Sequence, residues 1–217
     1  MQHDPTAPED ARRSPARRPA EVAHPVLAVV RDRWSARAID PDAVVDPTAL
    51  ATMLEAARWA PSSGNAQPWR YLVFDDTVPA ERERARACLK PRNEWAYAAP
   101  VLLVSVVSLT WPGSDEVNPS ALHDVGAASM ALCLQATALG LVCHQMAGFD
   151  PQRAREVCAL PDGTAPVAFI AVGHPGPLAA LDPSRRRREL RDRRRRPIAE
   201  TAFVGGYGGP GFGLEGV

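Results

Sequence analysis

Apolar residues recur along the chain with two periods, and these periods predict helices and strands. The clearest helix begins at Asp46, a suitable N-cap, and its residues Leu50, Met53, Leu54 and Ala57 recur at helical spacing. Short apolar runs between turn-forming residues predict β-strands instead. Four such strands are expected, over residues 70–74, 100–107, 141–146 and 166–173.

Further helices complete the predicted pattern. They are expected before Arg33, over residues 79–90, from about Ser120 to Leu139, and from Asp150 onward. Small residues such as Gly126 in the long helix would let another helix approach closely. Four strands mixed with four or five helices indicate an α+β or three-layer domain.

Both ends of the chain lack apolar periodicity. Residues 1–24 are rich in Pro, Ala, Arg and acids, and we expect a disordered or loosely held arm there. Residues 201–217 form a glycine-rich tail, which leaves residues 25–200 as the folded domain. GYGGPG at 206–211 has the letters of a dinucleotide-binding fingerprint, but it lacks the preceding strand, the following helix and the later acid that such a site needs. We therefore expect a flexible tail.

The charge balance argues against nucleic acid and acidic membranes as partners. The 217 residues include 25 basic and 25 acidic side chains, and 46% are hydrophobic, which is enough for a packed core. The exception is RRRRELRDRRRR at residues 185–196. It has no aromatic residues among its arginines, so we interpret it as a solvated, partly helical segment, with nucleic-acid binding as the alternative. One or two of these arginines can still serve an anionic ligand.

Several other kinds of site lack a sequence signal. The four cysteines occur singly and the histidines do not have metal-ligand spacing, so no metal centre is predicted. A serine-hydrolase motif is also missing. The longest apolar run, residues 100–109, is half the length of a membrane span, and no apolar stretch follows the N-terminal charges. We therefore expect a cytoplasmic protein that does not enter a membrane.

Two short polar segments carry the candidate chemistry. RWSAR at 33–37 is expected at the end of the first helix, where Arg33 and Arg37 at i and i+4 can converge with Ser35 on one phosphate. PSSGNAQ at 61–67 is too polar for the core and too regular for a linker. By itself this second segment is interpreted as a helix-to-strand turn.

RWSAR followed about 25 residues later by PSSGNAQPWRY resembles the nitroreductase family of flavoproteins. The resemblance continues in order through NEWAYAAPVLLV, HDVGAASMALCLQATALGL, HQMAGFD and RRRRPIAE. It covers about residues 25–200, and the ordered set is far more specific than any single segment. It implies an α+β, nitroreductase-like three-layer fold, with a central, mostly antiparallel sheet flanked by helices, in an intertwined homodimer.

The resemblance further implies that two subunits bind one FMN at each of two shared sites. The RWSAR motif would contact the FMN phosphate, ribityl chain and pyrimidine edge, and the 61–67 loop would contact the flavin from the other subunit. Asn93 would approach the pyrimidine end, residues 147 and 148 would lie near N5, and two C-terminal arginines would complete the phosphate site. The cofactor-binding residues implied in this way are Arg33, Trp34, Ser35, Arg37, Pro61, Ser62, Ser63, Asn65, Gln67, Asn93, Ala147, Gly148, Arg193 and Arg195.

The activity implied by the resemblance is that of an NAD(P)H-dependent flavin oxidoreductase. NADPH or NADH would reduce FMN, leave, and be replaced by a small-molecule acceptor of nitroaromatic or quinone type. The flavin carries the chemistry, so no catalytic side chain is predicted; many relatives have a glutamate near Ala147, and its acid role is missing here. A guanidinium such as Arg37 near flavin N1 would favour the reduced form. The alternatives are an FMN-binding carrier or sensor without efficient turnover, and a flavin-dependent desaturase of a biosynthetic pathway.

Overall fold

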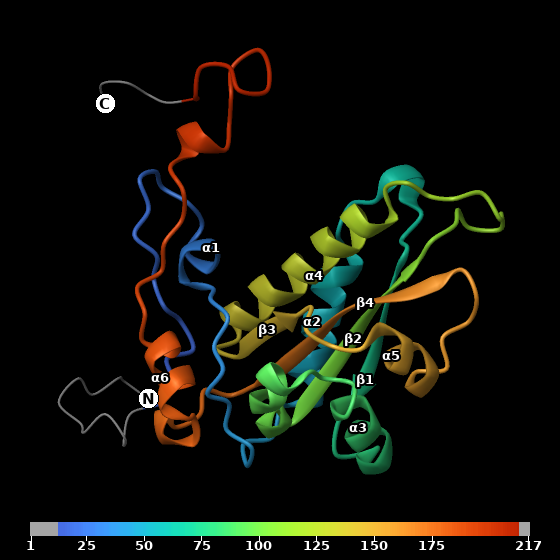
Figure 1. Cartoon of the computed structure of the whole chain (residues 1–217), viewed down its shortest axis with the longest axis vertical. Coiled ribbons are helices and arrows are strands. Elements are labelled where there is room, and N and C mark those ends of the chain that lie inside the picture. The colour runs from blue at the N-terminus through green and yellow to red at the C-terminus, as the bar shows by residue number, and fades with distance from the viewer. Residues whose placement is uncertain (1–12, 213–217) are drawn as a thin grey trace.

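A four-stranded antiparallel sheet lies at the centre of the molecule (Figure 1). The computed structural model describes residues 13–212. The strands are adjacent in the order β1 (Trp69–Phe74), β2 (Val101–Ser108), β4 (Thr164–Gly173) and β3 (Val142–Met146). All four predicted strands are therefore confirmed, and β1 and β3 are the edges of the sheet.

The helices follow the predicted order along the chain. They are α1 (Ala28–Asp32), α2 (Pro47–Arg58), α3 (Pro79–Arg86), α4 (Ala121–Ala138), α5 (Pro151–Val157) and α6 (Pro183–Glu189). The carboxylates of Asp46, Asp150 and Asp182 accept backbone N–H groups at the starts of α2, α5 and α6, as expected for N-caps. The helix predicted over 79–90 ends earlier, at Arg86, because Leu89 pairs with Phe149 in an isolated β-bridge and the N–H of Lys90 donates to the carbonyl of Gly148. Within residues 13–212, no helix is long and apolar enough to cross a membrane.

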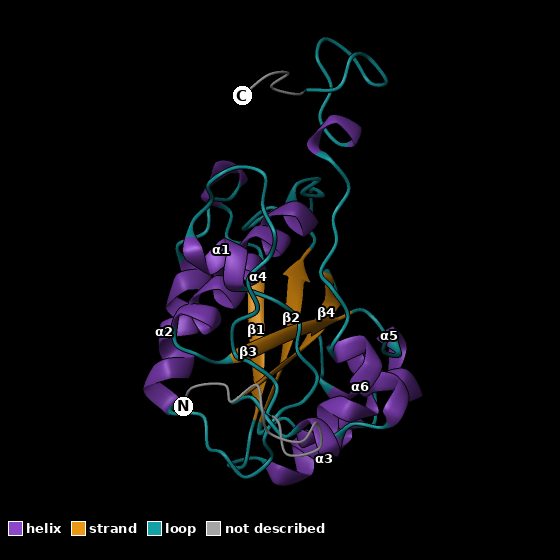
Figure 2. Ribbon diagram, turned by 90° about the vertical axis from the view of Figure 1, so that its left-hand side faces the viewer, coloured by secondary structure: helices purple, strands orange, loops and turns teal. Residues whose placement is uncertain are grey.

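Helices cover both faces of the sheet and produce three layers (Figure 2). Because side chains alternate along a strand, the fully buried β2 contributes to two separate cores. Leu102 and Val104 pack on the side of α3 and α5, whereas Leu103 and Val107 pack on the side of α2 and α4. The predicted α+β three-layer fold is confirmed.

The N-terminal and C-terminal segments run side by side along one end of the domain (Figure 1). From the predicted loosely held arm, residues 1–12 lie outside the described residues. Ser14 is buried, and its backbone N–H donates to the carbonyl of Gly176 over 2.8 Å. The predicted domain limits at residues 25 and 200 stay a prediction, but contacts with the domain begin before residue 25.

The glycine-rich tail folds back on itself. Residues 203 and 211 form an isolated β-bridge, and the backbone N–H of Val204 donates to the carbonyl of Pro210 over 2.8 Å. The GYGGPG segment lies inside this loop, and Tyr207 at its centre is fully exposed. This context differs from the strand and helix that a dinucleotide fingerprint requires.

Candidate functional site

The RWSAR segment is extended rather than helical. Helix α1 ends at Asp32, and Arg33 has φ −60° and ψ 132°. Alternate side chains therefore point to opposite sides, so that Arg33, Ser35 and Arg37 are partly exposed on one side. The expected helical geometry of this segment is wrong, because residues 33–37 are extended and strand-like alternation places these side chains on one side. Nη1 of Arg33 lies 3.4 Å from Oγ of Ser35.

Trp34 lies on the opposite side of this segment from the two arginines. Its side chain is buried, and the indole N–H donates to the carbonyl of Pro15 over 2.9 Å. The guanidinium of Arg18 lies above the ring, 5.2 Å from its centroid. The structure thus uses Trp34, one of the predicted cofactor contacts, to hold the N-terminal segment and does not bring it together with Arg33 and Arg37.

A buried carboxylate fixes the position of the RWSAR segment. The side chain of Glu189, at the end of α6, is fully buried. It accepts the backbone N–H groups of Arg37 over 2.8 Å and Ala38 over 3.1 Å, and the hydroxyl of Ser14 over 2.8 Å. Sequence reasoning missed Glu189, although one acid within an arginine run is a recognisable signal for a buried partner.

Arg33 of the RWSAR segment and three neighbouring arginines form a positively charged cluster. Arg193 donates to the backbone carbonyls of Arg18 and Arg31, the latter over 2.6 Å. Burial lowers the pKa of Arg193, and the positive charges of Arg33, Arg195 and Arg18 lower it further, with a smaller opposing effect from Asp32. We call Arg18, Arg33, Arg193 and Arg195 the arginine cluster. Its mutual repulsion makes this end of the domain suitable for an anion such as a phosphate.

Strand β3 lies beside the arginines and carries a neutral histidine. Nδ1 of His144 lies 2.9 Å from the carbonyl oxygen of Ala36, and its ring contacts the ring of Trp95 with centroids 4.6 Å apart. Burial lowers the pKa of His144 to about 4, and the charges of Arg37 and Arg33 act in the same direction. His144 is thus neutral at pH 7 and anchors the RWSAR backbone to the sheet.

The turn after β3 brings together three further predicted FMN contacts that belong to the same chain as the RWSAR segment: Asn93, Ala147 and Gly148. Ala147 is exposed at the end of the strand, and Gly148 is buried next to it. The side-chain amide of Asn93 donates to the carbonyl of Gly148 over 2.9 Å. A Cβ at position 148 would lie 2.6 Å from that amide nitrogen and 2.7 Å from Nε of Arg92, so any larger residue would displace the side chain of Asn93 or Arg92.

The 61–67 loop is held in an unusual backbone conformation. Gly64, Asn65 and Gln67 have φ values of 56°, 54° and 45°. Residues other than glycine rarely adopt this left-handed backbone region. The backbone N–H of Ser63 donates to a carboxylate oxygen of Asp124 over 3.1 Å, which fixes the loop to the first turn of α4. Concentrated strain of this kind is typical of binding sites.

The 61–67 loop contacts one end of α4, and α1 and the N-terminal segment lie near the other end (Figure 1). Asp124 belongs to the first turn of α4, whereas Arg17, which precedes a member of the cluster, donates to the carbonyls of Thr137 and Ala138 in the last turn. A helix of 18 residues is about 27 Å long. One chain therefore does not bring the two groups of predicted FMN contacts together.

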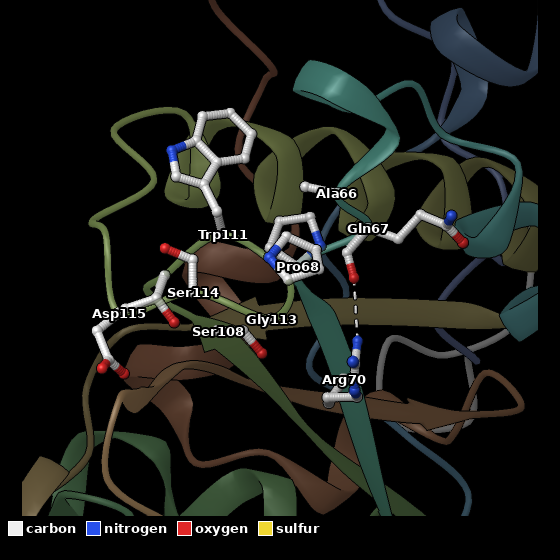
Figure 3. Close-up of a pocket in the computed structure, with 11 residues that line it drawn as sticks. Ala66, Gln67, Pro68, Arg70, Ser108, Trp111, Gly113, Ser114 and Asp115 are labelled. Carbon is white, nitrogen blue, oxygen red and sulfur yellow. Dashed lines mark hydrogen bonds between the residues drawn. The ribbon is translucent and has the colours of Figure 1, made fainter.

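A pocket of about 440 Å³ opens beside the 61–67 loop. One wall consists of the end of the loop and the start of β1, and the other consists of the segment that follows β2 (Figure 3). Gln67 and Arg70 line the first wall, and Trp111, Ser114 and Asp115 line the second. Sequence reasoning did not single out this pocket, because the second wall is a polar loop without a recognisable motif.

Comparison with known proteins places this chain in a family. The family model described as the nitroreductase family matches residues 30–174, and the chain belongs to that family. A solved structure described as an oxidoreductase containing FMN superposes with a TM-score of 0.80 at 32% identity, and the match covers 88% of this chain and 96% of that one. The predicted resemblance is confirmed.

Two curated relatives are also similar to this chain. An uncharacterized 15.4 kDa protein from Mycolicibacterium smegmatis is 37% identical over 123 residues, which cover 56% of this chain and 81% of the relative. A protein named NADH dehydrogenase from Thermus thermophilus is 31% identical over 159 residues, which cover 58% of this chain and 75% of the relative.

Removing the Glu189 carboxylate should destabilise the folded domain. We expect Glu189→Ala to lower the free energy of unfolding by about 3 to 5 kcal/mol, because two backbone N–H groups and a hydroxyl lose their acceptor in a buried position. Glu189→Gln keeps one acceptor oxygen and should cost less. Urea unfolding measures both, with the exposed Glu200→Ala as the matched control. Equal stability of Glu189→Ala and Glu200→Ala would contradict the anchoring role.

The low pKa of His144 predicts a pH-dependent stability. Since the unfolded chain binds a proton near pH 6.5 and the folded chain only near pH 4, stability is complete above pH 6.5 and declines as the pH falls from 6.5 to 4. The loss should reach up to about 3 kcal/mol. Urea unfolding at pH 7.5 and pH 5 tests this, with FMN content held equal. His144→Gln should lose this part of the pH dependence, and an unchanged dependence would refute the assignment.

Proposed function

We propose that this chain is an FMN-dependent oxidoreductase that takes electrons from NADPH or NADH and passes them to a small organic acceptor, of nitroaromatic or quinone type. The observation that supports this best is the arginine cluster, which gathers four positive charges next to an anchored, extended RWSAR segment. Membership of the nitroreductase family and the similarity to an oxidoreductase containing FMN support the choice of flavin.

The residues at this end of the domain fit FMN. Arg33, Arg193 and Arg195 would hold the phosphate through charge-assisted hydrogen bonds, and the Ser35 hydroxyl would add another. Arg37, whose backbone is fixed by Glu189, would place positive charge near the ring edge that becomes negative on reduction. Bound FMN supplies hydride transfer. The chain would bind and orient the ring and tune its electrostatics, with no protein acid or base assigned to the reaction.

The turn after β3 would contact the flavin ring through its backbone. The exposed Ala147 has no large side chain that would cover a flat ring, and the fixed Gly148 carbonyl keeps the turn in one conformation. Asn93, which holds that carbonyl, would face the pyrimidine end of the ring. Its amide has two N–H groups, so it can bind the turn and still offer a donor.

A homodimer would complete the site, because the 61–67 loop lies at the far end of α4 from the arginine cluster. An unpartnered apolar stripe on α4 supports this arrangement. Its members recur every four residues and are exposed or half-buried: Leu122, Gly126, Met130, Leu134 and Ala138. Val26, Leu27 and Val30 around α1 are exposed as well. Pro61, Ser62, Ser63, Asn65 and Gln67 of each subunit would then contact the flavin held by the other.

Nucleic-acid binding by residues 185–196 has less support. Arg185 forms an ion pair with Asp182 and donates to the carbonyl of Pro91. Its side chain therefore already has a structural role in the fold. This alternative predicts strongly salt-dependent binding of duplex DNA or RNA, which the proposed oxidoreductase function does not.

An absorbance spectrum of the purified protein from 300 to 550 nm tests the proposed function. It is repeated anaerobically after addition of NADPH and then NADH. Flavin bands that bleach with either donor are the expected result. Flavin bands that persist with both donors would favour a carrier or sensor, and a protein that takes up no FMN would overturn the proposal.

Replacing Arg33 with Ala should weaken FMN binding about ten- to hundredfold, because a charge-assisted hydrogen bond to phosphate contributes about 1.5 to 3 kcal/mol. Fluorescence titration of FMN measures the Kd. Arg84→Ala, which removes an exposed arginine on α3, is the control and should leave the Kd unchanged. An unaltered Kd in a folded Arg33→Ala protein would remove Arg33 from the site.

Mixing two inactive variants tests whether sites are shared between subunits. Arg33→Ala damages one half of the site and Ser63→Trp obstructs the other. When the two variants are unfolded and refolded together, each heterodimer regains one intact site, so about a quarter of all sites should bind FMN with the original affinity. Each variant refolded alone is the control. No recovery in the mixture would argue against a site built from two subunits.

A further inference from the structure

The pocket beside the 61–67 loop has the size and chemistry of a binding site for a small aromatic anion. Its volume of about 440 Å³ suits a molecule of one or two rings. Figure 3 shows that it lies between Arg70 on one side and the segment with Trp111, Ser114 and Asp115 on the other. Neither the RWSAR segment nor the arginine cluster lines it.

The second wall of the pocket is fixed by backbone hydrogen bonds. The N–H of Trp111 donates to the carbonyl of Glu116 over 2.9 Å, and the N–H of Asn118 donates to the carbonyl of Leu109 over 2.8 Å. Residues 110 and 117 form a β-bridge between these bonds. The wall is therefore preformed, and a ligand would not have to order it.

Arg70 is the cation of this pocket, and its orientation is fixed. Its Nη1 donates to the carbonyls of Gln67 over 3.0 Å and Trp69 over 2.7 Å, one of which is drawn in Figure 3. Arg70 is exposed, and among the described residues no carboxylate forms an ion pair with it. Its remaining N–H groups can therefore bind an anionic group of a ligand.

Among the described residues, Asp115 is the only carboxylate that lines the pocket, and it lies across the pocket from Arg70 (Figure 3). It does not neutralise Arg70. A ligand that places its anion on Arg70 would thus extend its other end toward Asp115, where a neutral or donor group is favoured.

Trp111 connects the pocket to the 61–67 loop. A Cβ at Gly64 would lie 3.5 Å from the indole ring of Trp111, so the ring lies beside Gly64 of the loop. Its aromatic surface can contact the ring of a ligand. Residues 66 and 67 of the same loop line the pocket, so its occupant would lie next to the residues that we assign to the flavin.

We propose that this pocket binds the electron acceptor and favours aromatic acceptors with an anionic substituent, which Arg70 holds while Trp111 contacts the ring. This proposal rests on the proposed oxidoreductase function. For a nitroaromatic acceptor, the balanced reaction is Ar–NO2 + NAD(P)H + H+ → Ar–NO + NAD(P)+ + H2O. One N–O bond breaks, its oxygen leaves as water, and the nicotinamide supplies the two electrons.

Two acceptors of similar size and different charge test this proposal on the FMN-loaded protein. They are 4-nitrobenzoate and the neutral 4-nitrobenzyl alcohol, each measured with saturating NADPH or NADH. Arg70→Gln should lower kcat/KM for 4-nitrobenzoate about tenfold and leave kcat/KM for the alcohol within about twofold. Asp115→Asn should raise kcat/KM for 4-nitrobenzoate, because it removes a repulsive charge. Arg84→Gln is the matched control and should change neither.

The outcomes separate this proposal from the proposed function. An equal loss with both acceptors in Arg70→Gln, or a loss with neither, would overturn the pocket assignment while the enzyme still works. If the unaltered protein reduces no acceptor, the proposed function fails. Calorimetric titration with 4-nitrobenzoate then tests the pocket alone. Binding that weakens in Arg70→Gln would support the site, and absent binding or binding that the substitution leaves unchanged would overturn it.

Discussion

The buried carboxylate of Glu189 is the contact on which the candidate site depends. It joins three segments that are distant in sequence: the N-terminal segment through Ser14, the RWSAR segment through the N–H groups of Arg37 and Ala38, and α6, to which it belongs. A buried charge without partners would be very unfavourable, so these donors and the carboxylate hold each other in place. Together with the contact between His144 and the carbonyl of Ala36, this carboxylate sets the direction of the RWSAR segment and the side on which Arg33 and Arg37 lie.

The arginine cluster then becomes possible because other interactions offset its repulsion. Arg193 donates to two backbone carbonyls, Arg18 donates to the carbonyls of Glu189 and Leu190, and the ring of Trp34 lies beneath Arg18. These contacts hold the guanidiniums in place while most of their positive charge stays uncompensated. A multiply charged anion relieves that repulsion on binding, which is why a rigid cluster of like charges favours phosphate over a neutral ligand.

The sequence predicted the elements whose signals are local. Helix α2 has its cap and apolar period within 15 residues, and the continuous apolar run of β2 needs no partner to be recognised. The RWSAR segment was assigned to a helix end because its extended form depends on Glu189, 152 residues away, and on His144, which is bonded to Ala36. The position of Trp34, which the resemblance includes among the cofactor contacts, also depends on distant residues: its indole N–H donates to the carbonyl of Pro15, and Arg18 lies over its ring. The pocket at Arg70 could not be predicted, since two loops create it only after folding.

Helix α4 explains why the two halves of the predicted FMN site are separate in one chain and how they can still work together. Its first turn fixes the 61–67 loop through Asp124, and its last turn accepts the guanidinium of Arg17 next to the arginine cluster. A straight helix sets a fixed spacing between these ends. If two copies pack antiparallel along the apolar stripe of α4, the loop of each subunit lies next to the arginine cluster of the other. In that arrangement the strained backbone at Asn65 and Gln67 would lie against the flat flavin ring, where bulky side chains would block contact. The pocket at Arg70 follows directly after that strained turn, so the same helix would also place the proposed acceptor beside the flavin.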